Sequence, residues 1–288
     1  MCDSNNLPPR ISPAPGLYVL GTPIGNLGDL SLRGRDVLAS ADVVAAEDTR
    51  TSGRLVKLAG GTPRFVSLTE HNVTRRAADL VDAARSGVVV LVSDAGTPVV
   101  ADPGARLVEA CHAAGVPVFA LPGPSALAAA ISVAGFEGSD VHFLGFLPRP
   151  KHERLERLTR AAAGASVLVF FESPSRLAQT LREIADALGD PEVAVCRELT
   201  KIHEEVVRGR ASDLWARFAD TRGECTVVVS IPERAPASRE DVIDYMAEMQ
   251  RAGARRSGAA TEAAHRFEIS RSEAYELWPT DPVQPTQE

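Results

Sequence analysis

Short apolar runs alternate with amphipathic segments of helical length along most of this 288-residue chain. Runs such as "GLYVL", "GVVVLV" and "VPVFAL" have the composition of buried strands, and the segments between them are helical in pattern. Leu107, Val108, Cys111 and Ala114, for example, form one apolar stripe at helical spacing. This alternation predicts an α/β fold with a mainly parallel N-terminal sheet and helices on its faces.

The second half of the chain carries a further set of strand-like runs, with helices expected at 151–162, 175–188 and 211–219. The runs 191–198 and 203–209 follow each other with no room for a helix between them. Strands joined so directly pair antiparallel, so the C-terminal sheet is expected to be mixed.

Changes in composition predict the boundaries of the domains. The lead-in 1–15 holds four prolines and is expected to be disordered. An N-terminal α/β domain is expected over 16–121 and a second α/β domain over 122–232. After the linker "PERAPAS", residues 238–278 are predicted to form a small helical appendage.

Capping-box spacing supports the appendage. Ser238 with Asp241, and Ser270 with Glu273, have the residue types and the separation that begin helices.

Composition excludes several classes of protein. A net charge of −7 argues against a protein that coats naked nucleic acid non-specifically. No apolar run is long enough to span a membrane, and the N-terminus lacks the pattern of a secretory signal. The four cysteines are scattered, as in a reduced cytosolic protein, and the histidines show no metal-ligand spacing, so no metal is expected.

Two basic clusters, "RPKHERLERLTR" (149–160) and "RAGARR" (251–256), allow two interpretations. Each is either a solvated helix face or a patch that faces RNA.

Loops rich in glycine, proline and charged residues follow many of the expected strands. In open α/β sheets, ligands bind beyond the carboxyl ends of the strands, so loops of this kind predict a ligand cleft between the two domains. The glycines do not fit a dinucleotide fingerprint or a phosphate-binding P-loop. The loops are 21–31, 46–50, 67–72, 93–104, 121–126, 170–176 and 196–201.

These loops, in this order, carry a resemblance to a known family. "TPIGNLGDLSLR", "AAEDTR", "EHN", "LVSDAGTPVVADPG", "LPGPSA", "GFLPR", "FFESPSRL" and "CRELTK" resemble the tetrapyrrole methylase superfamily of S-adenosylmethionine-dependent methyltransferases. More narrowly, they resemble its small-subunit ribosomal RNA methyltransferases. The resemblance covers roughly residues 16 to 232, and Gly21 stands where a proline is common before Thr22.

The resemblance implies 2′-O-methylation of a decoding-site cytidine in 16S ribosomal RNA, within the small ribosomal subunit. It also implies a cytoplasmic homodimer, and we expect neither a membrane nor DNA as a partner. The cofactor would be S-adenosylmethionine, bound in the cleft between the domains. Its expected contacts are Asp94, Gly96, Thr97, Val99, Val100, Pro122, Ser125, Ala126, Phe171, Glu172 and Arg197.

The acceptor is expected on the N-terminal side of the cleft. There Asp48 or Glu47 would take the proton of the ribose hydroxyl, and Arg50 would bind a phosphate. The alternative is that these three side chains form a salt bridge that orders a helix start. Further substrate contacts are expected at Asn26, Asp29, His71, Asn72, Arg149 and Arg176.

Two other functions fit parts of the sequence. One is methylation of a tetrapyrrole by another member of the superfamily, although "EDTR" and "ESPSR" favour RNA. The other is a ligand-sensing DNA-binding regulator, because the tail resembles a helix–turn–helix. The glutamates of the tail offset its arginines, which argues against a recognition helix in the major groove.

Overall fold

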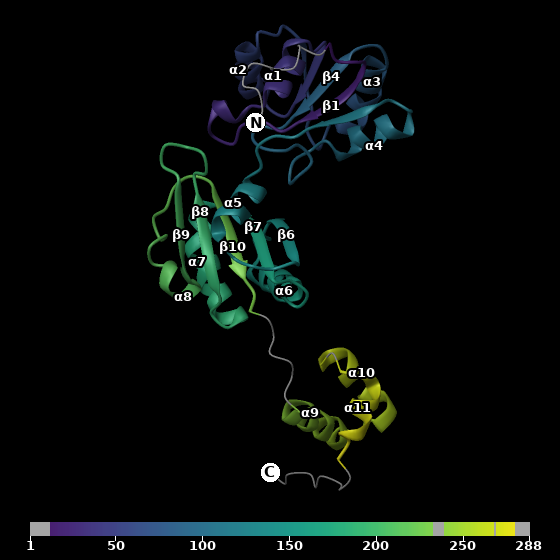
Figure 1. Cartoon of the computed structure of the whole chain (residues 1–288), viewed down its shortest axis with the longest axis vertical. Coiled ribbons are helices and arrows are strands. Elements are labelled where there is room, and N and C mark those ends of the chain that lie inside the picture. Colours follow the sequence, from purple (N-terminus) through teal and green to yellow (C-terminus); the bar gives the residue numbers. More distant parts are fainter. Residues whose placement is uncertain (1–11, 233–238, 268, 280–288) are drawn as a thin grey trace, which may run out of the picture. The chain divides into compact units, whose positions relative to one another are not determined.

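The computed structural model describes residues 12–232, 239–267 and 269–279, and the chain divides between Ile231 and Pro232 into two compact units (Figure 1). Most of the expected lead-in and the predicted cap Ser238 lie outside the described residues. The first unit contains two separate five-stranded sheets.

The first sheet is entirely parallel, which confirms the prediction for the N-terminal half. Its strand order is β3-β2-β4-β1-β5. Val88–Val92 at its centre is buried along its whole length, as expected of a strand covered on both faces. The strands are β1 (Gly16–Leu20), β2 (Val43–Ala46), β3 (Arg64–Ser67), β4 (Val88–Val92) and β5 (Val118–Leu121).

Helices cover both faces of this sheet. On one face α1 (Leu32–Ala39) and α2 (Thr49–Ala59) pack against side chains from β1, β2 and β4. On the other face α3 (Val73–Ser86) and α4 (Ala105–Ala113) do the same. A short 3-10 helix, η1 (Leu27–Asp29), follows β1. Because every strand runs the same way, the loops that follow the strands gather at one edge.

The second sheet is mixed, with the order β6-β7-β10-β8-β9. β6 and β7 are parallel, β10 is antiparallel to both of its neighbours, and β8 and β9 form the predicted antiparallel pair. The strands are β6 (Val141–Phe146), β7 (Val167–Glu172), β8 (Glu192–Arg197), β9 (Glu205–Arg210) and β10 (Cys225–Ser230).

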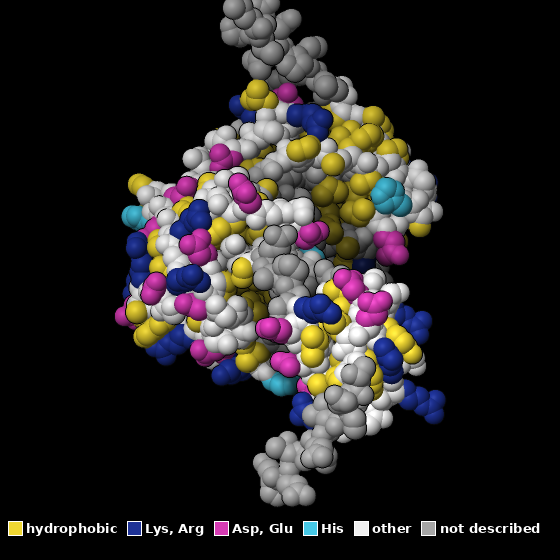
Figure 2. All heavy atoms as spheres, turned by 60° about the horizontal axis from the view of Figure 1, so that its bottom comes forward, with side chains coloured by type: hydrophobic (Ala, Val, Ile, Leu, Met, Phe, Trp, Pro, Cys, Tyr) yellow, Lys and Arg dark blue, Asp and Glu magenta, His cyan; other side chains and the backbone are white. Residues whose placement is uncertain are grey.

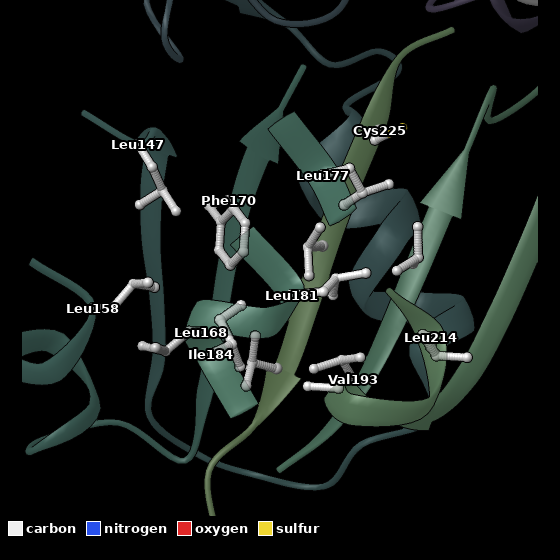
Figure 3. Close-up of a cluster of buried hydrophobic side chains, with 14 of the residues drawn as sticks. Leu147, Leu158, Leu168, Phe170, Leu177, Leu181, Ile184, Val193, Leu214 and Cys225 are labelled. Atoms are coloured by element: carbon white, nitrogen blue, oxygen red, sulfur yellow. The ribbon is translucent and has the colours of Figure 1, made fainter. Parts of the chain in front are cut away.

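One face of the second sheet is covered by α6 (Lys151–Ala162), α7 (Pro174–Leu188) and α8 (Ala211–Leu214). Figure 3 shows the resulting core, in which Phe170 and the leucines of α7 lie between helix and sheet. The predicted helix 211–219 is too long. Beyond Leu214 the chain changes to hydrogen bonds three residues apart, from Phe218 N to Trp215 O and from Ala219 N to Ala216 O, which end the helix.

The other face of the second sheet is covered by α5 (Ala126–Ala134). Ile24, from the loop after β1, is buried in the same cluster beside Ala130 and Leu199. The loop after the first strand therefore contributes to the core of the second sheet, which couples the two sheets physically.

A buried ion pair anchors α6 to α7. The guanidinium of Arg154 donates from Nε to Glu183 Oε2 (2.7 Å) and from Nη2 to Glu183 Oε1 (2.8 Å), and both side chains are about 5% exposed. Its Nη1 donates to the carbonyls of Pro148 and Arg149. The basic cluster 149–160 is therefore not a wholly solvated face, because this arginine belongs to the interior.

The described residues of the second unit form three helices, α9 (Arg239–Arg251), α10 (Arg256–Phe267) and α11 (Arg271–Glu276), with their own small core. Ser270 and Glu273 form the predicted capping box. The basic cluster 251–256 is partly engaged there, since Arg256 stacks on Tyr275 and donates to its carbonyl oxygen. Among the described residues, no helix is long and apolar enough to cross a membrane.

We predict that Glu183→Gln lowers the free energy of unfolding by about 3 kcal/mol, because it leaves the buried guanidinium of Arg154 without a charged partner. Glu156→Gln removes an exposed partner of Arg160 in the same helix and should cost less than about 1 kcal/mol. Urea unfolding of both variants measures the difference. Equal losses would mean that the Arg154–Glu183 pair contributes no more than a surface pair.

Candidate functional site

Two loops that follow strands of the first sheet are joined by a pair of backbone hydrogen bonds. Thr22 N donates to Gly96 O (2.8 Å), and Gly96 N donates to Thr22 O (3.0 Å). The buried hydroxyl of Thr22 lies 3.2 Å from Gly96 O and 3.3 Å from Ser93 O, within reach of both acceptors. These hydrogen bonds therefore hold the loop after β1 against the loop after β4.

A third loop, 121–126, joins the same structure. Gly21 N donates to Leu121 O, and the hydroxyl of Thr97 donates to Pro124 O (3.2 Å). Gly21 and Gly123 pass so closely that a Cβ atom on Gly123 would lie 2.4 Å from Gly21 O. Only glycine permits this approach, which explains why the chain has Gly21 where the resemblance leads one to expect proline.

The loop 93–104 is held in a strained conformation. Val99 (φ 75°) and Ala101 (φ 65°) both occupy the left-handed region, which a β-branched residue such as valine rarely adopts. Strain of this kind persists only where the surroundings impose it, and it concentrates at functional sites. Val99 is also 39% exposed, so the strain presents an apolar side chain at the surface.

The loop 196–201 of the second sheet meets the loop after β1. A Cβ atom on Gly25 would lie 2.3 Å from Lys201 Cγ and 2.9 Å from Thr200 Oγ1. Glu198 (φ 52°) and Thr200 (φ 67°) are again in the left-handed region. Lys201 Nζ binds Glu198 (2.8 Å) and Glu224 (2.9 Å), which fixes the loop.

Carboxylates gather where β2 and β4 end. Asp94 Oδ1 accepts a hydrogen bond from Asp48 N (3.0 Å), which ties the two strand ends together. Burial, and then the neighbouring charges of Asp94 and Glu70, raise the pKa of Glu47. Burial also raises the pKa of Asp102 to about 6, with Glu47 and Asp94 adding to the rise and a hydrogen bond from Ser93 opposing it. This edge of the sheet therefore holds two carboxyl groups with raised pKa values, Glu47 and Asp102, and the pKa of Asp102 is about 6.

Asp48 differs from its neighbours. Its carboxylate caps α2 by accepting from Arg50 N (2.8 Å) and pairs with the Arg50 guanidinium (2.7 Å). Hydrogen bonds from Arg50 lower the pKa of Asp48 to about 2. This salt bridge lies at the start of α2, and the low pKa makes Asp48 a weak base. The side chain of Arg50 is 90% exposed.

Glu172 and Arg176 form a network inside the second sheet's half. The Glu172 carboxylate, 1% exposed, accepts from Ser173 N, Thr180 Oγ1 and Arg176 Nη2. Arg176 also donates to the carbonyls of Leu147 and Pro148. These side chains hold the loop after β6.

Most of the remaining predicted site residues lie in loops, where several have local partners. Arg197 pairs with Glu205 (3.1 Å), and Asn26 caps η1, in which Asp29 is exposed. Asn72 accepts from Thr69 N and donates to Ser67 O. His71, Arg149 and Pro122 are exposed, and Ser125 and Ala126 begin α5. Phe171 is half-buried, and Val100 lies beside the strained Val99.

An apolar depression of about 860 Å³ adjoins the loop 93–104. Figure 2 shows hydrophobic side chains gathered in a hollow on one face of the molecule, whereas acidic and basic side chains are interspersed elsewhere on that face. The depression is lined by Val19, Pro98, Val99, Ala105, Val108, Glu109, His112, Ala113 and Ala120.

The reading of the sequence missed the residues that connect the loops. Thr22 and Ile24 do so, and their partners are distant in sequence, so no local pattern marks them. The raised pKa of Asp102 also depends on neighbours from other strands. The only signal in the sequence was the position of Thr22 between Gly21 and Pro23.

Comparison with known proteins places these loops in a family. The model of the tetrapyrrole (corrin/porphyrin) methylases matches residues 16–215. A Thermotoga maritima protein named ribosomal RNA small subunit methyltransferase I is 44% identical over 218 residues, which cover 74% of this chain and 97% of that protein. A Mycobacterium tuberculosis protein of the same name is 46% identical over 259 residues, covering 86% of this chain and 89% of that protein.

Solved structures share the fold. The uroporphyrin-III C-methyltransferase of Thermus thermophilus, solved in complex with S-adenosylhomocysteine, superposes with a TM-score of 0.54 and 19% identity. The similarity covers 75% of this chain and 97% of that one. The predicted fold class, a parallel and a mixed α/β sheet of tetrapyrrole methylase type with C-terminal helices, is confirmed.

The raised pKa of Asp102 generates a prediction about stability. Between pH 4 and 6 the folded protein keeps this proton while the unfolded chain releases it, so the free energy of unfolding falls as the pH rises through that window. Asp102→Asn has no titrating carboxyl group at this position, so this fall in the free energy of unfolding with rising pH is absent from the variant. The stability of the variant relative to wild type should therefore increase by about 1 kcal/mol from pH 4 to pH 7, allowing for solvent screening of a half-buried group. Urea unfolding at both pH values checks this, and a constant difference would contradict it.

Proposed function

The chain belongs to the tetrapyrrole (corrin/porphyrin) methylase family and, within it, to the ribosomal RNA small subunit methyltransferases, and from this premise we propose its substrate, cofactor and site. It is a methyltransferase. We propose that it transfers the methyl group of S-adenosylmethionine to RNA of the small ribosomal subunit, at the ribose 2′-oxygen of a decoding-site cytidine in 16S RNA. The observation that carries the choice of RNA is the identity of 46% over 259 residues, which extends beyond both sheets.

The joined loops suit the proposed cofactor. Gly96 has no side chain and adopts a φ of 79°, and a Cβ atom there would be in van der Waals contact with Ile24 Cγ2, at 3.4 Å. The exposed carboxylate of Asp94 suits an ammonium group, and Val99 offers an apolar surface to a purine. When bound, S-adenosylmethionine supplies an electrophilic methyl group on a sulfonium.

We assign the cofactor to the junction of the first-sheet loops, with the ends of β7 and β8 on the other side. Its proposed contacts are Asp94, Gly96, Thr97, Val99, Val100, Pro122, Ser125, Ala126, Phe171 and Arg197. The carboxylate of Glu172 is buried and engaged by Ser173, Thr180 and Arg176, so Glu172 supports the end of β7 from the interior.

In this proposal the ribose that accepts the methyl group binds near the loops that follow β2 and β3. A ribose hydroxyl is a poor nucleophile at neutral pH and must lose its proton during or after attack. Glu47 is the proposed proton acceptor, because its raised pKa makes it a stronger base than the ion-paired Asp48. Asp48 holds Arg50 at the start of α2, and the exposed guanidinium of Arg50 binds a phosphate of the RNA.

Further RNA contacts are proposed in the loops around this edge. His71 and Asn72 lie in the loop after β3, whose Glu70 is close enough to influence Glu47. Asn26 and Asp29 belong to the loop after β1, and Arg149 belongs to the loop after β6. The guanidinium of Arg176 is engaged by Glu172 and by the carbonyls of that loop, so Arg176 positions the loop. These side chains surround a base that must leave its stack to be reached.

We also propose that the chain works in the cytoplasm as a homodimer on assembled small subunits. The part of the apolar depression formed by Ala105, Val108 and Ala113 of α4 supports self-association, because contiguous exposed apolar surface marks sites of interaction. The net charge of −7 favours recognition of an assembled particle over non-specific binding to free RNA.

The proposal predicts that small ribosomal subunits lacking the modification take up labelled methyl groups from S-adenosylmethionine. Digestion and mass spectrometry should place the label on the 2′-oxygen of one cytidine of the decoding site. A label on a base would contradict the proposed reaction. Methylation of a tetrapyrrole precursor, without methylation of subunits, would contradict the proposed substrate.

The assignment of the base predicts a contrast between two adjacent residues. Glu47→Gln removes the proton acceptor and should lower turnover on subunits by about 100-fold or more. Asp48→Asn keeps a side chain able to cap α2 and should leave turnover close to that of wild type. Single-turnover kinetics with saturating cofactor measure both. The reverse order of effects would make Asp48 the base.

A further inference from the structure

Phe146, the last residue of β6, is a large hydrophobic side chain that is 61% exposed. Its neighbour in sequence, Leu147, is 3% exposed and belongs to the core between the sheet and α6 and α7. The chain therefore buries the leucine and leaves the larger aromatic side chain in water.

A bulge in β6 produces this arrangement. The pairing with β7 shifts register between Phe143 and Phe146, and Gly145 between them has φ 60°. In a regular strand Phe146 would follow Leu144 onto the core face, because side chains alternate. The extra residue instead puts Leu144 and Leu147 in that core and turns Phe146 to the face of Phe143. Bulges that re-aim a side chain are typical of functional sites.

Phe146 is the exposed end of a row of aromatic rings. Its ring meets Phe171 edge-on at 5.5 Å between centroids, and Phe171 meets Phe143 in the same way at 5.1 Å. Edge-to-face contacts of this kind fix the orientation of a ring. Phe146 therefore presents its surface in a set direction.

The backbone after Phe146 is also fixed. Arg176 donates to the carbonyls of Leu147 and Pro148, and Arg154 donates to those of Pro148 and Arg149. Both guanidiniums are held in turn by carboxylates, of Glu172 and Glu183. The ring of Phe146 thus precedes a loop in which three consecutive carbonyl groups accept hydrogen bonds from the side chains of Arg154 and Arg176.

The surroundings of this ring point to a nucleic acid. A Cβ atom on Gly145 would lie 3.9 Å from Ala101 Cβ, so the end of β6 adjoins the loop 93–104. Arg149, three residues after Phe146, is exposed, as is Lys151 at the start of α6. An aromatic face flanked by cations is the combination that binds unpaired bases together with their phosphates.

We propose that Phe146 is a stacking platform for an unpaired base of the RNA substrate, with Arg149 binding a neighbouring phosphate. The inference rests on the proposed function and adds to it a specific contact for the strand that holds the methylated nucleotide. Phe146 is a binding residue in this account, since it touches a base and takes no part in the transfer of protons.

Three variants test the proposal. Phe146→Ala should raise KM for small subunits by about tenfold, the size of one lost base–aromatic contact, with little change in the affinity for S-adenosylmethionine. Phe146→Trp should restore the wild-type KM. The matched control is Phe119→Ala, which removes an exposed phenylalanine of β5 that stacks on Tyr18, and it should leave KM unchanged.

Other outcomes would overturn the proposal. An unchanged KM in Phe146→Ala, measured while the wild type methylates subunits, would refute the stacking role and leave the proposed function intact. If calorimetry showed that Phe146→Ala lowers the affinity for S-adenosylmethionine by as much as it raises KM for subunits, the ring would be assigned to the adenine of the cofactor. A change in mass by light scattering would assign it to self-association.

A binding measurement keeps the two proposals separate. If the wild type methylates no subunits, the proposed function fails on its own. The indole introduced by Phe146→Trp can still be titrated with small ribosomal subunits, with the signal of the same titration of the wild type, which contains Trp215 and Trp278, subtracted. Quenching that saturates supports the platform, and an unchanged signal contradicts it.

Discussion

The site depends on the reciprocal hydrogen bonds between the backbones of Thr22 and Gly96. They join loops that follow two strands of the parallel sheet, and the next residues along the first loop carry Ile24 into the core of the second sheet. Backbone hydrogen bonds of this kind are insensitive to side-chain chemistry but require close approach, which explains the small residues around them. The arrangement of the candidate site is therefore set by the main chain.

The loops of both sheets' halves are held in fixed conformations, one with a strained backbone and one by a buried side chain. The left-handed residues Val99 and Ala101 lie in a loop of the first sheet, and the buried guanidinium of Arg154 braces a loop of the second. Each strained residue costs about 1–3 kcal/mol, which the surrounding contacts must offset. The cores on both faces of each sheet supply those contacts. A rigid loop is useful here because methyl transfer requires alignment more than strong chemical activation.

The sequence alone was sufficient to predict both sheets, because strand periodicity and the short connection between β8 and β9 are local signals. It predicted the capping box of Ser270 for the same reason. It could not separate Glu47 from Asp48, since their difference arises from Arg50, Asp94 and Glu70 in the folded chain. The sequence could not predict the bulge at Gly145 or the burial of Arg154 either, because both depend on partners that are distant in sequence.

The central claim, that the loop joined at Thr22 and Gly96 carries the cofactor, is tested most directly by calorimetry of two glycine variants. Gly96 (φ 79°) and Gly60 (φ 83°) have nearly the same backbone conformation, so valine at either position strains the chain alike, by about 1–2 kcal/mol. Gly60 ends α2 with open space around it. Folded Gly96→Val should lose affinity for S-adenosylmethionine by at least about tenfold, whereas Gly60→Val should keep it. Equal affinities in the two variants would show that the loop joined at Thr22 and Gly96 does not hold the cofactor.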